Sequence, residues 1–310
     1  MIIEKLCGWL KRHDTRILAA APFVALLWQE GAEALRPFVV PLSAIIVTLS
    51  CVRMDWGGLG VHLRRPLAMG FAVFWVQIAA PLIVFAVASP LAAADPALLT
   101  GLILNAAAPS ILMAPAFAII IGVEPTLTLA VAVVSTALAP LTVPAMLDLL
   151  GLGTLDIPAI DLLLRLTVFV SIVFAGAWIV KRLAGEERIE RHRWSIDGVL
   201  VLLMSALVIG IMDGVTAVVV ADPLKVALYV VLAFVANFGM QVVGWIIWWW
   251  RDRGQSLELA ILSGYRNMAM ILAVIIDVAP IDVVIFVICC QFPMFILPLL
   301  TRPLFRRLQA

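Results

Sequence analysis

Long apolar runs follow one another along the chain, separated by short polar or Pro/Gly-rich segments. Each run approaches or exceeds the ~20 apolar residues with which a helix crosses the hydrocarbon core of a bilayer. The pattern therefore predicts ten membrane-spanning helices joined by short connections. They cover about residues 16–31, 36–52, 66–89, 98–122, 126–150, 158–181, 196–220, 223–249, 256–277 and 280–301.

Composition agrees with this pattern. The chain has 310 residues, of which 64% are hydrophobic and 13% charged, whereas soluble domains have about 45–50% apolar and ~25% charged residues. These values exclude a soluble enzyme, a receptor ectodomain and a protein that binds nucleic acid. We expect an all-α membrane protein whose surroundings are the lipid bilayer.

The basic residues predict an orientation. If both termini are cytoplasmic, 17 of the 21 basic residues fall on the cytoplasmic side, as the positive-inside rule requires. An even number of spans gives this distribution, and an odd number does not. We expect a multi-pass protein of the bacterial inner (plasma) membrane. The cytoplasmic residues would be Lys5, Lys11, Arg12, Arg16, Arg53, Arg64, Arg65, Lys181, Arg182, Arg188, Arg191, Arg193, Arg251, Arg253, Arg302, Arg306 and Arg307.

The two halves of the chain show a weak repeat. Phe117–Pro125 (FAIIIGVEP) is similar to Leu272–Pro280 (LAVIIDVAP), half a chain further on. Because each half holds five spans, an odd number, the second half would insert upside down relative to the first. This is the inverted repeat of secondary transporters. We expect a single transporter unit with repeats at about 1–155 and 156–310.

The fourth predicted span contains Pro109, Ser110 and Pro115 near its middle. A proline has no N–H and clashes with the carbonyl four residues earlier, so it interrupts a helix. The carbonyls of Asn105 and Ile111 are expected to lose their helical partners. In a membrane such groups are satisfied by protein, water or ligand, which makes this stretch a candidate substrate- or ion-binding site.

The ninth predicted span carries Ser263, Gly264, Arg266 and Asn267 at the corresponding depth. A charge at the centre of a membrane helix costs about 2.5–3.5 kcal/mol on insertion scales. Arg266 should therefore face the protein interior, with a partner or a ligand. A structural ion pair is the alternative, and its candidate partners are Asp213, Glu258 and Asp277.

Two further polar residues lie within predicted spans. Asp213 is a possible proton relay, although it could equally pair with a cation. Gln77 is a weaker binding candidate, because a lone buried glutamine more often bonds two helices together. The sequence contains no nucleotide-binding or hydrolase motif. We expect no enzymatic activity, no metal site and no cofactor.

These residues resemble the bile acid:sodium symporter family, most clearly over residues 105–149 and 262–273. The resemblance implies ten helices in two inverted five-helix repeats, with a six-helix core domain and a four-helix panel domain. It also implies that the fourth and ninth helices are broken and cross at the binding site.

Within the fourth and fifth helices the resemblance is partial. Pro109 matches the proline of the family's Pro-Gly-Gly stretch, and Ala114 and Pro115 stand where the family has a Ser-Asn pair. Two sodium-binding hydroxyl positions fall on Thr128 and Ala132, so only one hydroxyl is kept. A hydroxyl bonded back to its own helix is the alternative for Thr128.

In the ninth helix the family reads Glu-x-Gly-x-Gln-Asn. Leu262 stands at the Glu position, Gly264 and Asn267 are kept, and Arg266 stands at the Gln position. Gln77 matches a sodium-site glutamine of the third helix. The resemblance thus implies a divergent member that lacks most of the sodium ligands.

We expect a secondary transporter that moves a small organic anion by alternating access without the family's usual sodium coupling. Arg266, whose charge is permanent, would either hold the crossing together or bind a substrate carboxylate. Two alternatives stay open. One is a proton-coupled carrier or exchanger that uses Asp213 or another acid, and the other is a transport-inactive relative serving as a sensor or assembly partner. The sequence does not indicate an oligomeric state.

Overall fold

A computed structural model describes residues 7–10, 12–54, 66–152, 155 and 157–309. Within these ranges the regular structure is helical, apart from an isolated β-bridge between Ser110 and Arg266. The prediction of an all-α protein is confirmed. Four of the residues used to predict orientation, Lys5, Lys11, Arg64 and Arg65, lie outside the described residues.

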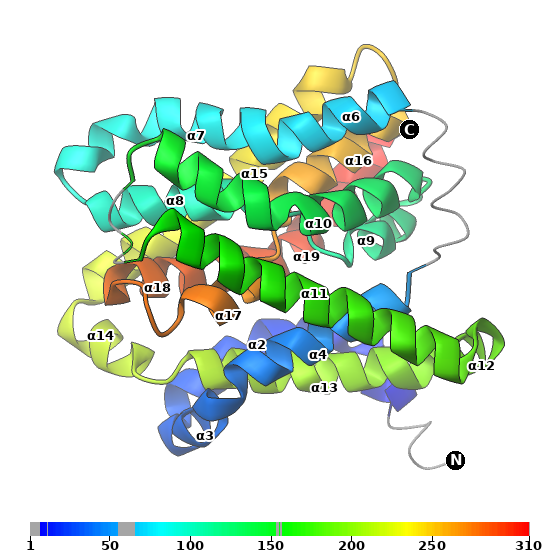
Figure 1. Ribbon diagram of the computed structural model, residues 1–310, viewed down its shortest axis with the longest axis horizontal. Helices are drawn as coiled ribbons and strands as arrows, with labels where there is room; N and C mark the ends of the chain where they lie inside the picture. The colour runs from blue at the N-terminus through cyan, green and yellow to red at the C-terminus, as the bar shows by residue number, and fades with distance from the viewer. Residues whose placement is uncertain (1–6, 11, 55–65, 153–154, 156, 310) are drawn as a thin grey trace. The chain divides into compact units, whose positions relative to one another are not determined.

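The chain forms two compact units, each built from two segments. Unit 1 comprises Met1–Met54 and Ser171–Val226, and unit 2 comprises Asp55–Val170 and Ala227–Ala310. In unit 1, α13 packs against α2, α3 and α4 (Figure 1). The helices of this unit are α2 (Asp14–Leu27), α3 (Gln29–Leu35), η1 (Arg36–Phe38), α4 (Val39–Val52), the second part of α11 (Ala159–Ala184), α12 (Glu186–Arg191), α13 (Arg193–Ile211) and α14 (Val215–Ala221).

Unit 2 holds the remaining helices. They are α6 (Pro66–Phe74), η2 (Trp75–Ala79), α7 (Ala80–Ala88), η3 (Ser89–Ala93), α8 (Pro96–Ala107), α9 (Ala114–Ile121), α10 (Thr126–Leu149), most of α15 (Pro223–Trp248), α16 (Arg253–Gly264), α17 (Met268–Ile275), α18 (Ile281–Cys289) and α19 (Gln291–Gln309). Here α8 packs against α7, α10 and α18, while α16 packs against α9 and α10.

Seven helical segments of the described chain are long and apolar enough to cross a membrane. The predicted fourth and ninth spans are not continuous: the structure divides them into α8 and α9 and into α16 and α17. The predicted span at 196–220 is also divided, because Gly214 has a left-handed φ of 74° and separates α13 from α14. The structure confirms a membrane protein, and the count of ten spans stays a prediction.

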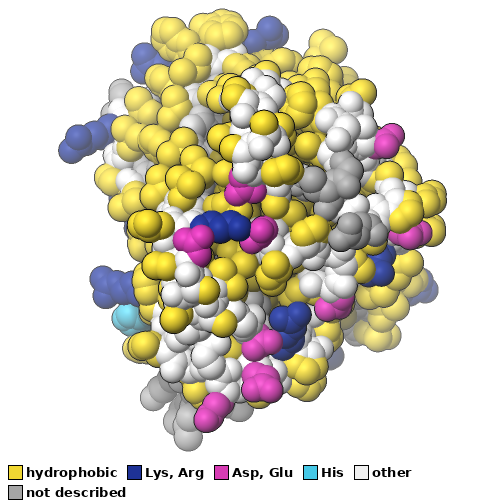
Figure 2. Space-filling model, turned by 90° about the vertical axis from the view of Figure 1, so that its left-hand side faces the viewer, with side chains coloured by type: hydrophobic (Ala, Val, Ile, Leu, Met, Phe, Trp, Pro, Cys, Tyr) yellow, Lys and Arg dark blue, Asp and Glu magenta, His cyan; other side chains and the backbone are white. Residues whose placement is uncertain are grey.

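Outward-facing helix surfaces are apolar, as contact with lipid requires. On α15, Leu224, Leu228, Val231 and Val235 follow one another at helical spacing, and each is more than half exposed. Figure 2 shows hydrophobic side chains over much of one face of the molecule, with charged side chains confined to small groups. Exposed apolar surface of this extent is characteristic of membrane proteins and rare on soluble monomers.

The two interrupted helices form the centre of unit 2. Every residue from 98 to 112 is buried, and so is every residue from 256 to 275. Each interrupted helix consists of a twelve-residue part followed by an eight-residue part: α8 and α9 in one, α16 and α17 in the other. The chain thus places two similar helix breaks inside the same buried region.

Candidate functional site

The first interruption follows directly from Pro109. A residue before proline is disfavoured in the α region, and Ala108 accordingly adopts φ −55° and ψ 145°, which ends α8. Pro115 has a different effect from the one predicted: it lies in the first turn of α9, where a missing N–H has no cost. The Ile111 carbonyl is not orphaned either, since it accepts a hydrogen bond from the Ala114 N–H at 3.0 Å.

The second interruption begins after Gly264, where Tyr265 is extended (φ −106°, ψ 100°). Asn267 then caps α17, because its Oδ1 accepts a hydrogen bond from the Met270 N–H at 3.3 Å. Gly264 is required for close packing against α15: an added Cβ would lie 2.5 Å from the Asn237 carbonyl oxygen, a main-chain atom that cannot move aside. The predicted glycine therefore brings two helices together.

The two interruptions pair with each other through their main chains. The Ile111 N–H donates to the Tyr265 carbonyl at 2.9 Å, and the Asn267 N–H donates to the Pro109 carbonyl at 2.8 Å. Ser110 adds a side-chain bond from its Oγ to the Leu262 carbonyl at 2.7 Å. We call residues 108–111 and 264–267 the crossing. Backbone groups freed by the helix breaks are thus satisfied within the protein.

Arg266 lies inside the crossing with only 2% of its surface exposed. Its Nε donates to the Ser263 carbonyl at 2.9 Å, and its Nη1 donates to the carbonyls of Val76 at 3.0 Å and Ala108 at 3.1 Å. All three carbonyls belong to irregular helix positions: the end of α16, the π-helical turn η2 and the end of α8. The guanidinium therefore binds carbonyl oxygens that these helices leave without a regular helical partner.

The predicted ion-pair alternative for Arg266 is wrong. The Glu258 carboxylate instead accepts a hydrogen bond from the Thr128 N–H at 2.8 Å, at the start of α10. Asp277 is exposed beyond the end of α17. Asp213 belongs to unit 1, where it forms an ion pair with Arg36 at 3.4 Å. In the described part of the chain, the positive charge of Arg266 therefore has no carboxylate partner.

Asp213 is also less deeply placed than predicted. Its side chain is 28% exposed and lies in the turn that Gly214 makes between α13 and α14. The sequence reading missed this turn because the apolar residues continue on both sides of it. The Asp-Gly pair was the signal that could have indicated it.

Gln77 is buried and connects η2 to α10. Its Nε2 donates to the Ser135 carbonyl and to the Thr142 hydroxyl, both at 2.9 Å, while its Oε1 has no hydrogen-bond partner in the described structure. The preceding residue, Val76, supplies one of the carbonyls bound by Arg266. Gln77 therefore borders the crossing, and its amide also makes the helix–helix bond given as the alternative.

Thr128 does not reach the crossing with its side chain. Its hydroxyl bonds back to the Pro125 carbonyl at 2.9 Å, which was the predicted alternative. Ser263 similarly donates to the Leu259 carbonyl at 2.6 Å and accepts from the Trp75 indole at 2.8 Å. Neither hydroxyl has a donor left for a ligand, and sequence reasoning missed both Trp75 and Val76.

Buried polar atoms near the crossing that lack a partner in the described structure include Gln77 Oε1, Asn105 Oδ1 and Arg266 Nη2. Asn105 precedes Ala108 by about one turn, and Gln77 follows Val76, so both side chains belong to segments that Arg266 contacts. Buried polar groups almost always find a partner. The unused donor and acceptors mark this region as the polar centre of unit 2.

Interrupted helices that meet at a buried polar centre are typical of secondary transporters. A family model described as the Sodium Bile acid symporter family matches residues 39–211 of the chain. The match covers more than half of the 310 residues, and the chain belongs to this family. It is therefore a membrane transporter of the sodium/bile acid symporter type. No curated protein matches the chain.

The matched range includes Gln77, Pro109 and Thr128 but ends before α16 and α17. The second half of the crossing, with Arg266, thus lies outside it. There, Leu262 is fully buried and contributes only its carbonyl, to Ser110. Ala132, also fully buried, has no side-chain oxygen. These positions do not offer the oxygen atoms that the resemblance assigns to a sodium ion.

Proposed function

We propose that this protein is a secondary transporter of a small organic anion that does not use sodium, because Arg266 supplies the positive charge at the crossing. The observation that carries the proposal is the set of three carbonyl oxygens around one buried guanidinium. A bound alkali ion would hold such oxygens in the same way, by attraction of their dipoles. A side chain does so without being taken up or released.

The fixed charge also disfavours sodium at this position. Two unit charges 5 Å apart repel by about 3 kcal/mol at an effective dielectric constant of 20, which lowers affinity by roughly two orders of magnitude. Arginine does not lose its proton to relieve this repulsion. The loss of a carboxylate at Leu262 acts in the same direction, since no negative charge remains there to compensate.

An anionic substrate is supported by the electrostatics of the crossing. Arg266 has no carboxylate partner in the described residues, and its Nη2 keeps an unused donor. The half-helices α9 and α17 both begin just beyond the crossing, so the positive ends of their dipoles lie next to it. Substrate, Arg266 and these helix ends would together form the binding site, which also includes Gln77, Ser110 and Asn267.

We further propose that the equal division of the two interrupted helices reflects inverted repeats at about 1–155 and 156–310. Under this proposal unit 2 corresponds to the family's core domain and unit 1 to its panel domain. Alternating access would carry the substrate across the bacterial inner membrane, with both termini cytoplasmic.

Uptake into proteoliposomes tests sodium independence. Carboxylates and sulfonates that raise the thermal stability of the purified protein would first be selected, and one radiolabelled hit would then be followed. We expect initial uptake rates that agree within twofold when external sodium is replaced by choline. Strong stimulation by sodium, abolished by choline, would overturn the proposal.

A proton-coupled carrier is the second candidate function. In such a carrier, Glu258 is better placed than Asp213 to take up and release the proton. Glu258 is 2% exposed and accepts a hydrogen bond from the main-chain N–H of Thr128, whereas Asp213 is partly exposed and paired with Arg36. The same proteoliposomes distinguish the candidates. An inward proton gradient would accelerate uptake in a proton-coupled carrier and leave it unchanged in an uncoupled one.

A further inference from the structure

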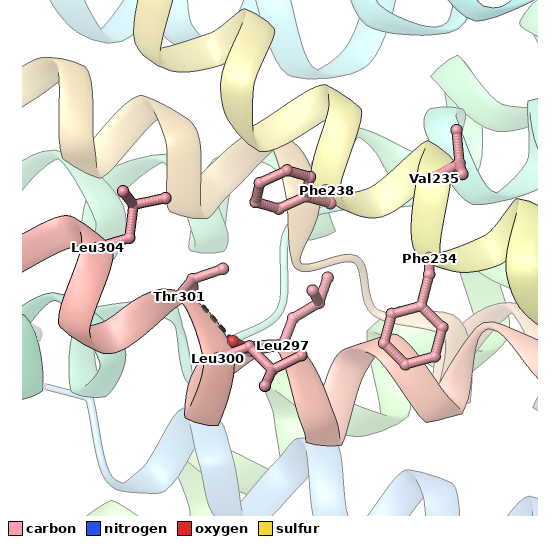
Figure 3. A pocket seen from close by; sticks show the side chains of 7 residues that line it. All are labelled: Phe234, Val235, Phe238, Leu297, Leu300, Thr301 and Leu304. Atoms are coloured by element: carbon pink, nitrogen blue, oxygen red, sulfur yellow. Dashed lines mark hydrogen bonds between the residues drawn. The ribbon is translucent and has the colours of Figure 1, made fainter.

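An apolar groove of about 390 Å³ lies between α15 and α19 in unit 2. Figure 3 shows Leu304 at one end of the groove and Phe234 at the other. Val235 and Leu300 on its walls are each about 60% exposed, so the groove is open to the surroundings. Its lining consists of Phe234, Val235, Phe238, Leu297, Leu300, Thr301 and Leu304.

The two helices run in the same direction along the groove. Residue numbers rise from the Phe234 end towards the Leu304 end on both helices in Figure 3. The order of the spans agrees, since α15, the interrupted helix α16–α17 and the segment Ile281–Leu308 follow one another. Successive spans cross a membrane in opposite directions, so the first and the third run in the same direction. The C-terminal ends of α15 and α19 therefore lie at the same end of the groove.

That end carries the side chains of a membrane interface. Arg307 lies on the helix face of Leu300 and Leu304, one turn further on, and it is exposed. At the end of α15, Trp245 stacks on Trp249, which directly follows the helix, with ring centroids 6.2 Å apart. Trp245 lies on the helix face that continues from Phe238. Tryptophan and arginine at the end of an apolar surface are typical of contacts with lipid headgroups.

We propose that this groove binds an acyl chain of an anionic phospholipid whose headgroup phosphate is held by Arg307 beside Trp245 and Trp249. The apolar walls accept a hydrocarbon chain, and the guanidinium selects a negatively charged headgroup over a neutral one. This inference concerns a surface distinct from the crossing. It does not depend on the transport mechanism.

The groove is connected to the crossing by one hydrogen bond. The Oγ1 of Thr301, on the groove wall, lies 3.1 Å from the hydroxyl oxygen of Tyr265. Tyr265 in turn accepts the main-chain bond from Ile111. A lipid that packs against Thr301 therefore stabilises Tyr265, the neighbour of Arg266 in the crossing, and we expect it to raise the thermal stability of the protein.

Native mass spectrometry of the delipidated full-length protein tests the proposal. Palmitoyl-oleoyl phosphatidylglycerol should be retained about fivefold more strongly than the matching phosphatidylcholine, since one arginine near the surface contributes about that factor. Leu300→Trp fills the groove and should abolish the difference. The control Leu299→Trp alters an exposed neighbour outside the lining and should leave the difference intact.

The charge is tested separately. Arg307→Gln should remove the preference for phosphatidylglycerol, while Arg182→Gln, on the exposed end of α11 in unit 1, should keep it. Equal retention of the two lipids by the unaltered protein would overturn the proposal. So would a dimer that Leu300→Trp dissociates, because a second copy of the chain would then occupy the groove.

Discussion

Replacing Arg266 by methionine is expected to lower the free energy of unfolding by at least about 3 kcal/mol. Methionine fills much of the same volume but leaves the carbonyls of Ser263, Val76 and Ala108 without donors. Each orphaned buried acceptor costs about 1–3 kcal/mol. Replacing buried ion pairs by apolar residues is often harmless because both partners are removed. The partners of Arg266 are main-chain carbonyls, which stay buried when the side chain is replaced.

Thermal unfolding in detergent measures this effect, and a fall on the order of 5–10 °C is expected. Arg165→Met is the matched control, because Arg165 also lies within a spanning helix, α11, but is exposed. Arg266→Lys should give an intermediate value, since one ammonium cannot reach all three carbonyls with the geometry of the guanidinium fork. A stability of Arg266→Met equal to that of the control would contradict a structural role for the guanidinium.

The second large effect is a gain of sodium dependence. The double variant Leu262→Glu, Arg266→Gln restores the family's carboxylate and amide and removes the fixed cation. It would bury an uncompensated carboxylate, so we expect it to be unstable in choline chloride. Sodium should then stabilise it, by about 2.7 kcal/mol at a concentration 100-fold above the dissociation constant.

Potassium chloride at equal ionic strength controls for screening, and the unaltered protein should respond equally to sodium, potassium and choline. Arg266→Gln alone tests whether removing the cation is enough to make sodium stabilise the protein without the new carboxylate. We expect a weaker response to sodium from this single variant than from the double variant. A double variant whose melting temperature is the same in all three salts would show that the crossing cannot be converted to a sodium site. The proposal that Arg266 takes the place of a sodium ion would then lose its chemical basis.

Sequence reasoning located the helix breaks better than it located the contacts within them. Pro109 has a well-defined backbone effect, so the first interruption could be predicted. The second was placed correctly at Gly264, but this glycine ends α16 without a left-handed φ and acts through its close packing against α15. Pro115 was misread because a proline can open a helix as well as break one. Its role depends on where the preceding helix has already ended, and that is fixed six residues earlier by Pro109.

The partners of Arg266 could not be predicted. A charged residue in an apolar span indicates a buried partner, and the acidic side chains Glu258, Asp213 and Asp277 were the visible candidates. The actual acceptors are main-chain carbonyls, which every residue carries and which therefore leave no mark in the sequence. The π-helical turn at Trp75–Ala79, which provides one of them, has no distinctive residue pattern either.

Glu258 is a second buried polar residue whose partner could not be predicted from the sequence. It was considered only as a partner of Arg266, but the structure places it at the start of α10, where it accepts the Thr128 N–H. That helix has no capping side chain of its own, since Pro125 precedes it. The sequence contains the uncapped start and the buried acid, yet their proximity depends on how α16 packs against α10.

Binding of radioactive ²²Na⁺ to the purified, unaltered protein tests the central claim most directly. A guanidinium that already holds the carbonyls of the crossing leaves no place for the ion. We therefore predict no saturable binding that an excess of unlabelled sodium displaces. Saturable binding of one or more sodium ions per chain, lost in Leu262→Ala or other variants at the crossing, would contradict the account.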